Sequence, residues 1–109
     1  MIAGLEAALA QLAASGRTIG YGALARDLGL LAPGSIARLT SALEALMEAD
    51  AACGQPFRAT LCEARLAQGL PAAGFFAKAA ALGRNIGDPT RFVAAERAAL
   101  KEMAKGSGA

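Results

Sequence analysis

The apolar residues of this chain recur three or four positions apart over most of its length, which is the spacing of one face of a helix. The clearest case is residues 36–49, where we predict a helix with Ser35 as its N-cap and with an inward face of Ile36, Leu39, Leu43, Leu46 and Met47. Shorter patterns predict further helices over residues 2–15, 22–28, 76–82 and 88–104, and a brief extended piece at residues 17–21. The pattern indicates a mainly α-helical protein.

One stretch departs from helical spacing. Residues 57–66 alternate between apolar and polar positions, with Phe57 and Leu61 on the apolar side, which predicts a strand. A turn at residues 68–71 and a short second strand at residues 74–76 complete a small β-hairpin. Three helices followed by a hairpin form the winged helix-turn-helix arrangement, which is the predicted fold. The alternative is an all-helical bundle in which the alternating stretch is a loop.

The composition fits one small domain and excludes several kinds of chemistry. The chain has 109 residues, 55% of them hydrophobic and 18% charged, and we predict one domain over residues 1–104 with a flexible tail at residues 105–109. It contains no histidine, which removes Ser-His-Asp and Cys-His nucleophilic sites and the commonest zinc sites. We therefore expect no catalytic residue, no metal and no cofactor.

The cysteines and the N-terminal residues bear on the compartment. Cys53 and Cys62 are too few for a disulfide framework and are interpreted as two reduced thiols. Glu6 interrupts the first apolar stretch, which argues against a signal peptide, and no apolar run approaches the length needed to span a bilayer. A soluble cytoplasmic protein is expected.

Residues 16–29, with the sequence GRTIGYGALARDLG, resemble the helix-turn-helix entrance of the alkylguanine-DNA alkyltransferases. The similarity extends over about residues 16–50 and implies a winged-helix scaffold whose second helix, from Ser35 to Ala49, lies in a DNA groove. The family's nucleophile belongs to a Pro-Cys-His-Arg motif, which this chain lacks. Cys53 has no histidine to activate it, so alkyltransferase activity is not implied.

The charge pattern supplies the candidates for DNA binding. The net charge of +2 is mildly basic, and the positive residues concentrate in segments 17–39 and 56–87, on either side of an acidic segment. Basic side chains neutralise phosphates, and residues near the start of a recognition helix reach bases. The predicted nucleic-acid contacts are Arg17, Ser35, Arg38, Ser41, Arg58 and Arg65. Glu44, Glu48 and Asp50 argue against deep insertion of this helix into a DNA groove, because their negative charges repel phosphates.

The alternative function is binding of a protein partner without enzymatic activity. The turn at residues 68–71 is uncharged, which suits a protein contact, and its candidate residues are Leu70, Phe75 and Phe76. The same aromatic pair is also typical of a loop anchored in the core. The last helix is a candidate seam for a homodimer. A continuous positive strip across Arg17, Arg38, Arg58 and Arg65 would favour double-stranded DNA, and scattered charges would favour the protein partner.

Overall fold

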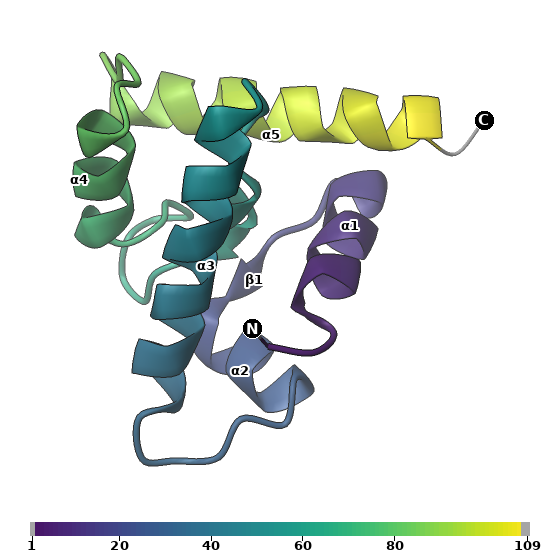
Figure 1. Ribbon diagram of the computed structural model, residues 1–109, viewed down its shortest axis with the longest axis vertical. Coiled ribbons are helices and arrows are strands. Elements are labelled where there is room, and N and C mark those ends of the chain that lie inside the picture. The colour runs from purple at the N-terminus through teal and green to yellow at the C-terminus, as the bar shows by residue number, and fades with distance from the viewer. Residues whose placement is uncertain (1, 108–109) are drawn as a thin grey trace.

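Five α-helices, one 3-10 helix and two very short strands make up the computed structural model, which describes residues 2–107. In Figure 1, α3 runs down the middle of the molecule, α5 crosses its upper end, and α1 and α4 stand on opposite sides. The elements in chain order are α1 (Leu5–Ser15), β1 (Ile19–Gly20), α2 (Tyr21–Asp27), α3 (Ser35–Ala52), η1 (Arg58–Leu61), β2 (Cys62–Glu63), α4 (Ala73–Ala81) and α5 (Pro89–Ser107). The predicted mainly α architecture is confirmed.

The clearest predicted pattern, that of α3, is confirmed with two differences. Four of its five apolar positions are buried, namely Leu39, Leu43, Leu46 and Met47. The fifth, Ile36, is 45% exposed because it lies in the first turn, beyond the elements that cover the rest of the helix. The predicted cap at Ser35 is wrong. Gly34, in the left-handed region with φ 83°, is the N-cap, and no side chain caps the helix.

The predicted β-hairpin is wrong. Residues 58–61 form the 3-10 helix η1, which is closed by hydrogen bonds that Thr60 donates from its N–H and its hydroxyl to the carbonyl oxygen of Phe57. Only Cys62 and Glu63 are extended, and they pair in parallel with Ile19 and Gly20 of β1. The expected second strand at residues 74–76 lies inside α4. A parallel pair needs a long connection, and here α2 and α3 provide it.

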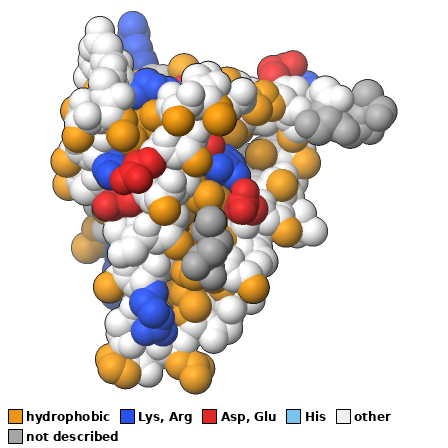
Figure 2. Space-filling view, viewed as in Figure 1, with side chains coloured by type: hydrophobic (Ala, Val, Ile, Leu, Met, Phe, Trp, Pro, Cys, Tyr) orange, Lys and Arg blue, Asp and Glu red, His pale blue; other side chains and the backbone are white. Residues whose placement is uncertain are grey.

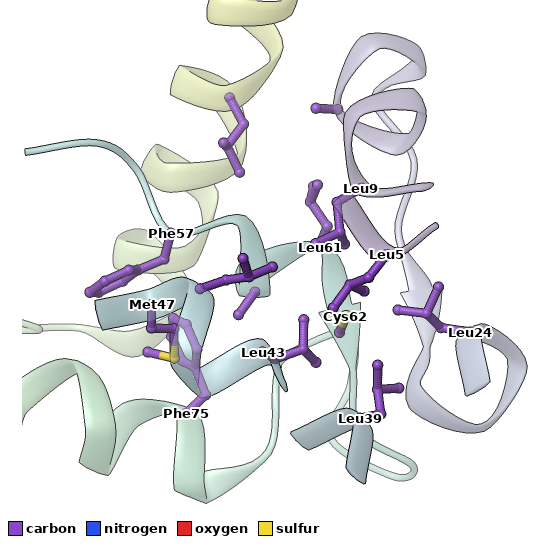
Figure 3. Packing of buried hydrophobic residues seen from close by; sticks show 14 of the residues in the cluster. Leu5, Leu9, Leu24, Leu39, Leu43, Met47, Phe57, Leu61, Cys62 and Phe75 are labelled. Carbon is purple, nitrogen blue, oxygen red and sulfur yellow. The ribbon is translucent and has the colours of Figure 1, made fainter. Parts of the chain in front are cut away.

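The core lies where the five α-helices and η1 converge. Leu5 and Leu9 of α1 meet Leu61 and Cys62, while Leu39 and Leu43 of α3 close the other side (Figure 3). The rings of Phe57 and Phe75 meet edge to face with centroids 5.9 Å apart, a geometry that aromatic pairs favour. Each buried leucine contributes about 1.5–3 kcal/mol to the free energy of unfolding.

Helix α5 begins as the sequence predicts. The carboxylate oxygen Oδ1 of Asp88 accepts a hydrogen bond of 3.1 Å from the backbone N–H of Arg91, which is the arrangement of an N-cap residue. The helix continues through Ser107, so residues 105–107 extend it instead of forming the expected tail. The rest of that tail lies outside the described residues. Among residues 2–107, no helix combines the length and apolar character that crossing a membrane requires.

Candidate binding surfaces

The four arginines whose continuity would favour DNA line four different hollows of the described surface. Arg17 lines one between α1 and α2, Arg38 lines one on the outer face of α3, and Arg58 lines one between α1 and α5. Arg65 lines a fourth, next to Tyr21. No two of these four arginines line the same one of these hollows.

Arg58 belongs to an ion-pair network inside the fold. Its guanidinium lies 2.9 Å from Asp50 of α3 and 2.8 Å from Glu6 of α1, and its backbone N–H also donates to Asp50. Burial alone would lower the pKa of Arg58, but the hydrogen bonds to these two carboxylates outweigh it and raise that pKa. Asp50 follows Ser35 by 15 residues, or about 22 Å along the helix. Arg58 therefore joins α1, η1 and α3 and does not reach the start of α3.

Arg38 fixes the turn that connects α2 to α3. Its guanidinium donates hydrogen bonds to the carbonyl oxygens of Leu31, at 2.6 Å, and of Pro33, at 3.1 Å. Ser35 is half-buried, and Ser41, six residues further along the same helix, is exposed. In Figure 2, a Lys/Arg patch covers the lower part of α3, and hydrophobic side chains form the tip beneath it. The start of α3 thus presents one arginine, already bonded to the turn.

A groove of about 700 Å³ opens beside the start of α2, and we call it the Tyr21 groove. It is lined by residues 20–22, by Ile36 and by residues 63–66 and 68–69. Tyr21 and Ile36 also line a smaller hollow of about 110 Å³ that leads toward Met47 and Phe75. The combined size lies within the range of small-ligand sites, about 300–1,000 Å³.

Two large apolar side chains that line the Tyr21 groove are exposed. Leu66 is 95% exposed and Ile36 is 45% exposed. Leu31, in the turn that leads into α3, is 78% exposed. Leu66 was placed in a strand by the sequence, and Ile36 in the core, so neither was predicted as a surface residue. The sequence signal for Leu66 as a surface residue is its place directly after Arg65 and shortly before the glycine-containing turn at residues 68–71.

The loop of residues 64–72 holds Leu66 in an unusual backbone conformation. Leu66 has φ 63° and Gln68 has φ 53°, both in the left-handed region that L side chains rarely adopt. Such residues cost about 1–2 kcal/mol each, and they persist only where the surroundings fix them. Leu66 is 95% exposed, so burial of its side chain does not offset this strain.

The surroundings that fix this loop come from α5 and α2. Arg97 of α5 donates hydrogen bonds of 2.7 Å to the carbonyl oxygens of Thr60 and Gly69. The hydroxyl of Tyr21 accepts a hydrogen bond of 3.2 Å from the N–H of Ala72. Burial lowers the pKa of Arg97, and the nearby charge of Glu63 opposes that effect. Hydrogen bonds at Gly69 and Ala72 therefore hold the second half of the loop.

The three residues first considered for a protein partner belong mostly to the core. Phe75 is buried against Phe57, and Phe76 is half-buried with its ring centroid 5.1 Å from that of Phe75. Leu70 is half-buried and packs against the same cluster. The aromatic pair anchors α4 instead of forming a surface. Among the nearby apolar side chains of the described loop, Leu66 is the exposed one, at 95%.

The two cysteines are free thiols in different environments. Cys53 is exposed after α3, whereas Cys62 is buried in β2. Burial raises the pKa of Cys62 to about 12, with Arg97 acting weakly in the opposite direction. A thiol of that pKa remains protonated and is a poor nucleophile at neutral pH. Within residues 2–107, no three His, Cys, Asp or Glu side chains form a group that could hold a metal ion.

The helix expected to form a homodimer seam, α5, lines a hollow together with α1. Met103 is 45% exposed there, and alanines of α1 form the facing wall. Leu100, which the sequence placed on the same apolar side, is buried and packs within the molecule. A homodimer through α5 stays a prediction.

Comparison with known proteins found no family model, no curated protein and no solved structure that matches this chain. The resemblance of residues 16–29 to the alkylguanine-DNA alkyltransferases therefore stays a prediction.

Proposed function

We propose that this protein is a non-enzymatic binding module that takes a segment of a protein partner into the Tyr21 groove. The observation that carries the proposal is that two exposed large apolar side chains, Ile36 and Leu66, line one hollow. Removing exposed apolar surface from water is the dominant favourable contribution to most protein–protein associations.

The rigidity of the groove lining also supports binding. Ile36 belongs to the first turn of α3, and Leu66 belongs to a loop held by hydrogen bonds from Arg97 and, near its far end, from Ala72 to Tyr21. Side chains that are already ordered lose little conformational entropy when a partner binds. The strain at Leu66 is then a cost of folding that is offset only in the complex.

The proposal is tested with a random peptide library displayed on phage and panned against the whole chain. Selected peptides are then titrated against Ile36→Gln and Leu66→Gln, each of which should weaken binding about 10-fold, or about 1.4 kcal/mol. Met103→Gln is the matched control, because Met103 has the same 45% exposure as Ile36 but lies on the α1–α5 hollow. Binding that survives both groove variants, or that depends on Met103, contradicts the proposal.

Double-stranded DNA is the second candidate, with α2 and α3 acting as a helix-turn-helix. It is favoured by the outer face of the first turns of α3, where Ala37, Arg38, Ser41 and Ala45 carry no acidic group and no side chain caps the helix. Uncapped helix N-termini attract phosphates. Against it, proteins that bind duplex DNA tightly make about 6–10 phosphate contacts, and the scattered arginines offer few on one face.

A titration with a 24-base-pair duplex at low salt tests this second candidate. Ser41→Glu adds a negative charge to the outer face of α3 without touching the turn that Arg38 holds, so it should abolish duplex binding. Ser41→Ala is the matched control and should keep most of it. An unchanged affinity in Ser41→Glu, or no binding at any salt concentration, removes the DNA function.

A further inference from the structure

The charges around the Tyr21 groove specify more than an apolar partner. Among the described residues, four basic side chains pair with carboxylates, at 2.9 Å for Arg58, 2.5 Å for Lys78, 3.0 Å for Arg84 and 3.3 Å for Lys105. Arg65, which lines the groove, is exposed and has no carboxylate partner among the described residues. Its positive charge therefore faces solvent beside Leu66.

A second arginine lies beside Gly22, which lines the same groove. Arg26 follows Gly22 by one helical turn, and its Nη1 atom is 3.7 Å from where a Cβ on Gly22 would stand. Within residues 2–107, Arg26 is likewise exposed and makes no ion pair. Its neighbour Asp27 lines a different hollow, together with Arg17. Because Gly22 has no side chain, this guanidinium lies close to the lining of the groove.

The acidic residue of the groove is already engaged. Glu63 accepts a hydrogen bond from the hydroxyl of Thr18. Its charge is also close enough to Arg97 to act on the pKa of that arginine. Glu63 is thus engaged by Thr18, whereas Arg65, which lines the same groove, pairs with no carboxylate within residues 2–107. Glu44 lines only the smaller hollow beyond Ile36.

We propose that the Tyr21 groove binds an acidic peptide segment, in which a large apolar side chain lies between Ile36 and Leu66 and an adjacent carboxylate pairs with Arg65. This partner chemistry rests on the protein-binding function proposed above. A second carboxylate, on the side of the segment facing α2, lies within reach of Arg26. Arginine pairs with carboxylates through two parallel hydrogen bonds, which fixes the orientation of the segment as well as its charge.

A segment of protein fits this arrangement better than a nucleic acid does. The most exposed side chain of the groove is a leucine, and only two arginines accompany it. Two cations supply far fewer phosphate contacts than the 6–10 or so of a tight duplex complex. They are enough, however, to select an acidic peptide from a neutral one, because specificity arises from a few well-placed charges.

The experiment compares two phage libraries of 12-residue peptides, panned against the whole chain. One library allows Asp and Glu at every position, and the other replaces them with Asn and Gln. We expect binders from the acidic library only, with a carboxylate next to Leu, Ile, Phe or Met. Converting that carboxylate to its amide in a synthetic peptide should weaken binding at least 10-fold.

Variants of the protein separate this proposal from the broader one. Arg65→Gln should weaken the selected peptide about 10-fold and Arg26→Gln about 3-fold, whereas Arg91→Gln, an exposed arginine on α5, should change nothing. Binding that depends on Leu66 but not on Arg65, or equal yields from both libraries, overturns the acidic specificity while keeping the groove. Binding that ignores Leu66 and Ile36 overturns both. A 24-base-pair duplex that displaces the peptide, and whose binding is lost in Arg65→Gln, also overturns the peptide proposal.

Discussion

Arg97 of α5 donates a hydrogen bond of 2.7 Å to the carbonyl oxygen of Gly69. These residues are 28 positions apart, and the contact ties the last helix to the loop that carries Leu66. The same guanidinium reaches Thr60 in η1, also at 2.7 Å. One side chain thus holds the 3-10 helix and the loop in fixed relation, and the shape of the Tyr21 groove depends on it.

Replacing Arg97 with lysine should loosen the loop. A lysine cannot make both hydrogen bonds with the fixed geometry of a guanidinium, so the free energy of unfolding should fall by about 1–3 kcal/mol. Amide hydrogen exchange should accelerate at Leu70, whose N–H donates to Ala67 within the loop. Arg91→Lys on the exposed side of the same helix serves as control, and an equal effect of both variants would contradict the role of Arg97.

Leu66→Asn should make the protein more stable while it weakens partner binding. Asparagine tolerates the left-handed backbone better than leucine does, and Leu66 loses no packing because it is 95% exposed. We expect a gain of about 0.5–1 kcal/mol in chemical denaturation, because the strain is relieved. Ala3→Asn, at an exposed position before α1, should change stability little. A loss of stability in Leu66→Asn would show that the leucine serves the fold.

The ion pairs of Arg58 should differ sharply in their contributions. Asp50 is buried and Glu6 has a side chain that is 59% exposed. Asp50→Asn leaves the half-buried guanidinium of Arg58 poorly compensated and should cost about 2–3 kcal/mol. Glu6→Gln removes only a solvent-screened pair and should cost about 0–1 kcal/mol. Urea denaturation measures both, and similar losses would refute the assignment of Asp50 as the main partner.

The buried thiol of Cys62 should make stability depend on alkaline pH. Its pKa is raised by burial from 9.0 to about 12, so between these values the unfolded chain loses the proton and the folded chain keeps it. The free energy of unfolding should therefore fall as pH rises above about 9, by up to about 1.4 kcal/mol per pH unit. Cys62→Ala removes this contribution. Urea denaturation at pH 8 and pH 10 measures the free energy of unfolding of both proteins. An equal change between the two pH values in both proteins would count against this role of Cys62.

Thiol reactivity offers a direct check of the same environment. At pH 8 a thiol reagent should modify Cys53 rapidly in the native protein, because Cys53 is exposed and Cys62 is buried. Both should react in denaturant. Rapid modification of Cys62 in the native protein would show that β2 opens.

The helices could be predicted from the sequence because their burial is one-sided. Leu39, Leu43 and Leu46 recur with the period of a helix, and all are buried in α3. Residues 57–66 could not be assigned in this way. Ala59 and Leu61 fit the alternation of a strand, but Thr60 between them is buried as well. Where every side of a segment is covered, alternation says nothing about its backbone.

The candidate groove was out of reach of the sequence because distant segments form it. Ile19 pairs with Cys62, 43 residues away, and that pairing brings Tyr21 beside residues 63–66. The role of Arg58 was hidden for the same reason, because its partners Asp50 and Glu6 lie 8 and 52 residues away. A charged side chain that the sequence assigns to a binding surface can instead form ion pairs within the fold, as Arg58 does.

The most direct test of the proposed binding surface is a two-dimensional ¹H–¹⁵N NMR titration of the whole chain with a selected acidic peptide. The account predicts shifts in the amide signals of Gly22, Ile36 and residues 64–69, with the signals of Ala10 and Ala14 beside the α1–α5 hollow unchanged. Shifts confined to Ala37, Ser41 and Ala45 on the outer face of α3, or to the α1–α5 hollow, would contradict it.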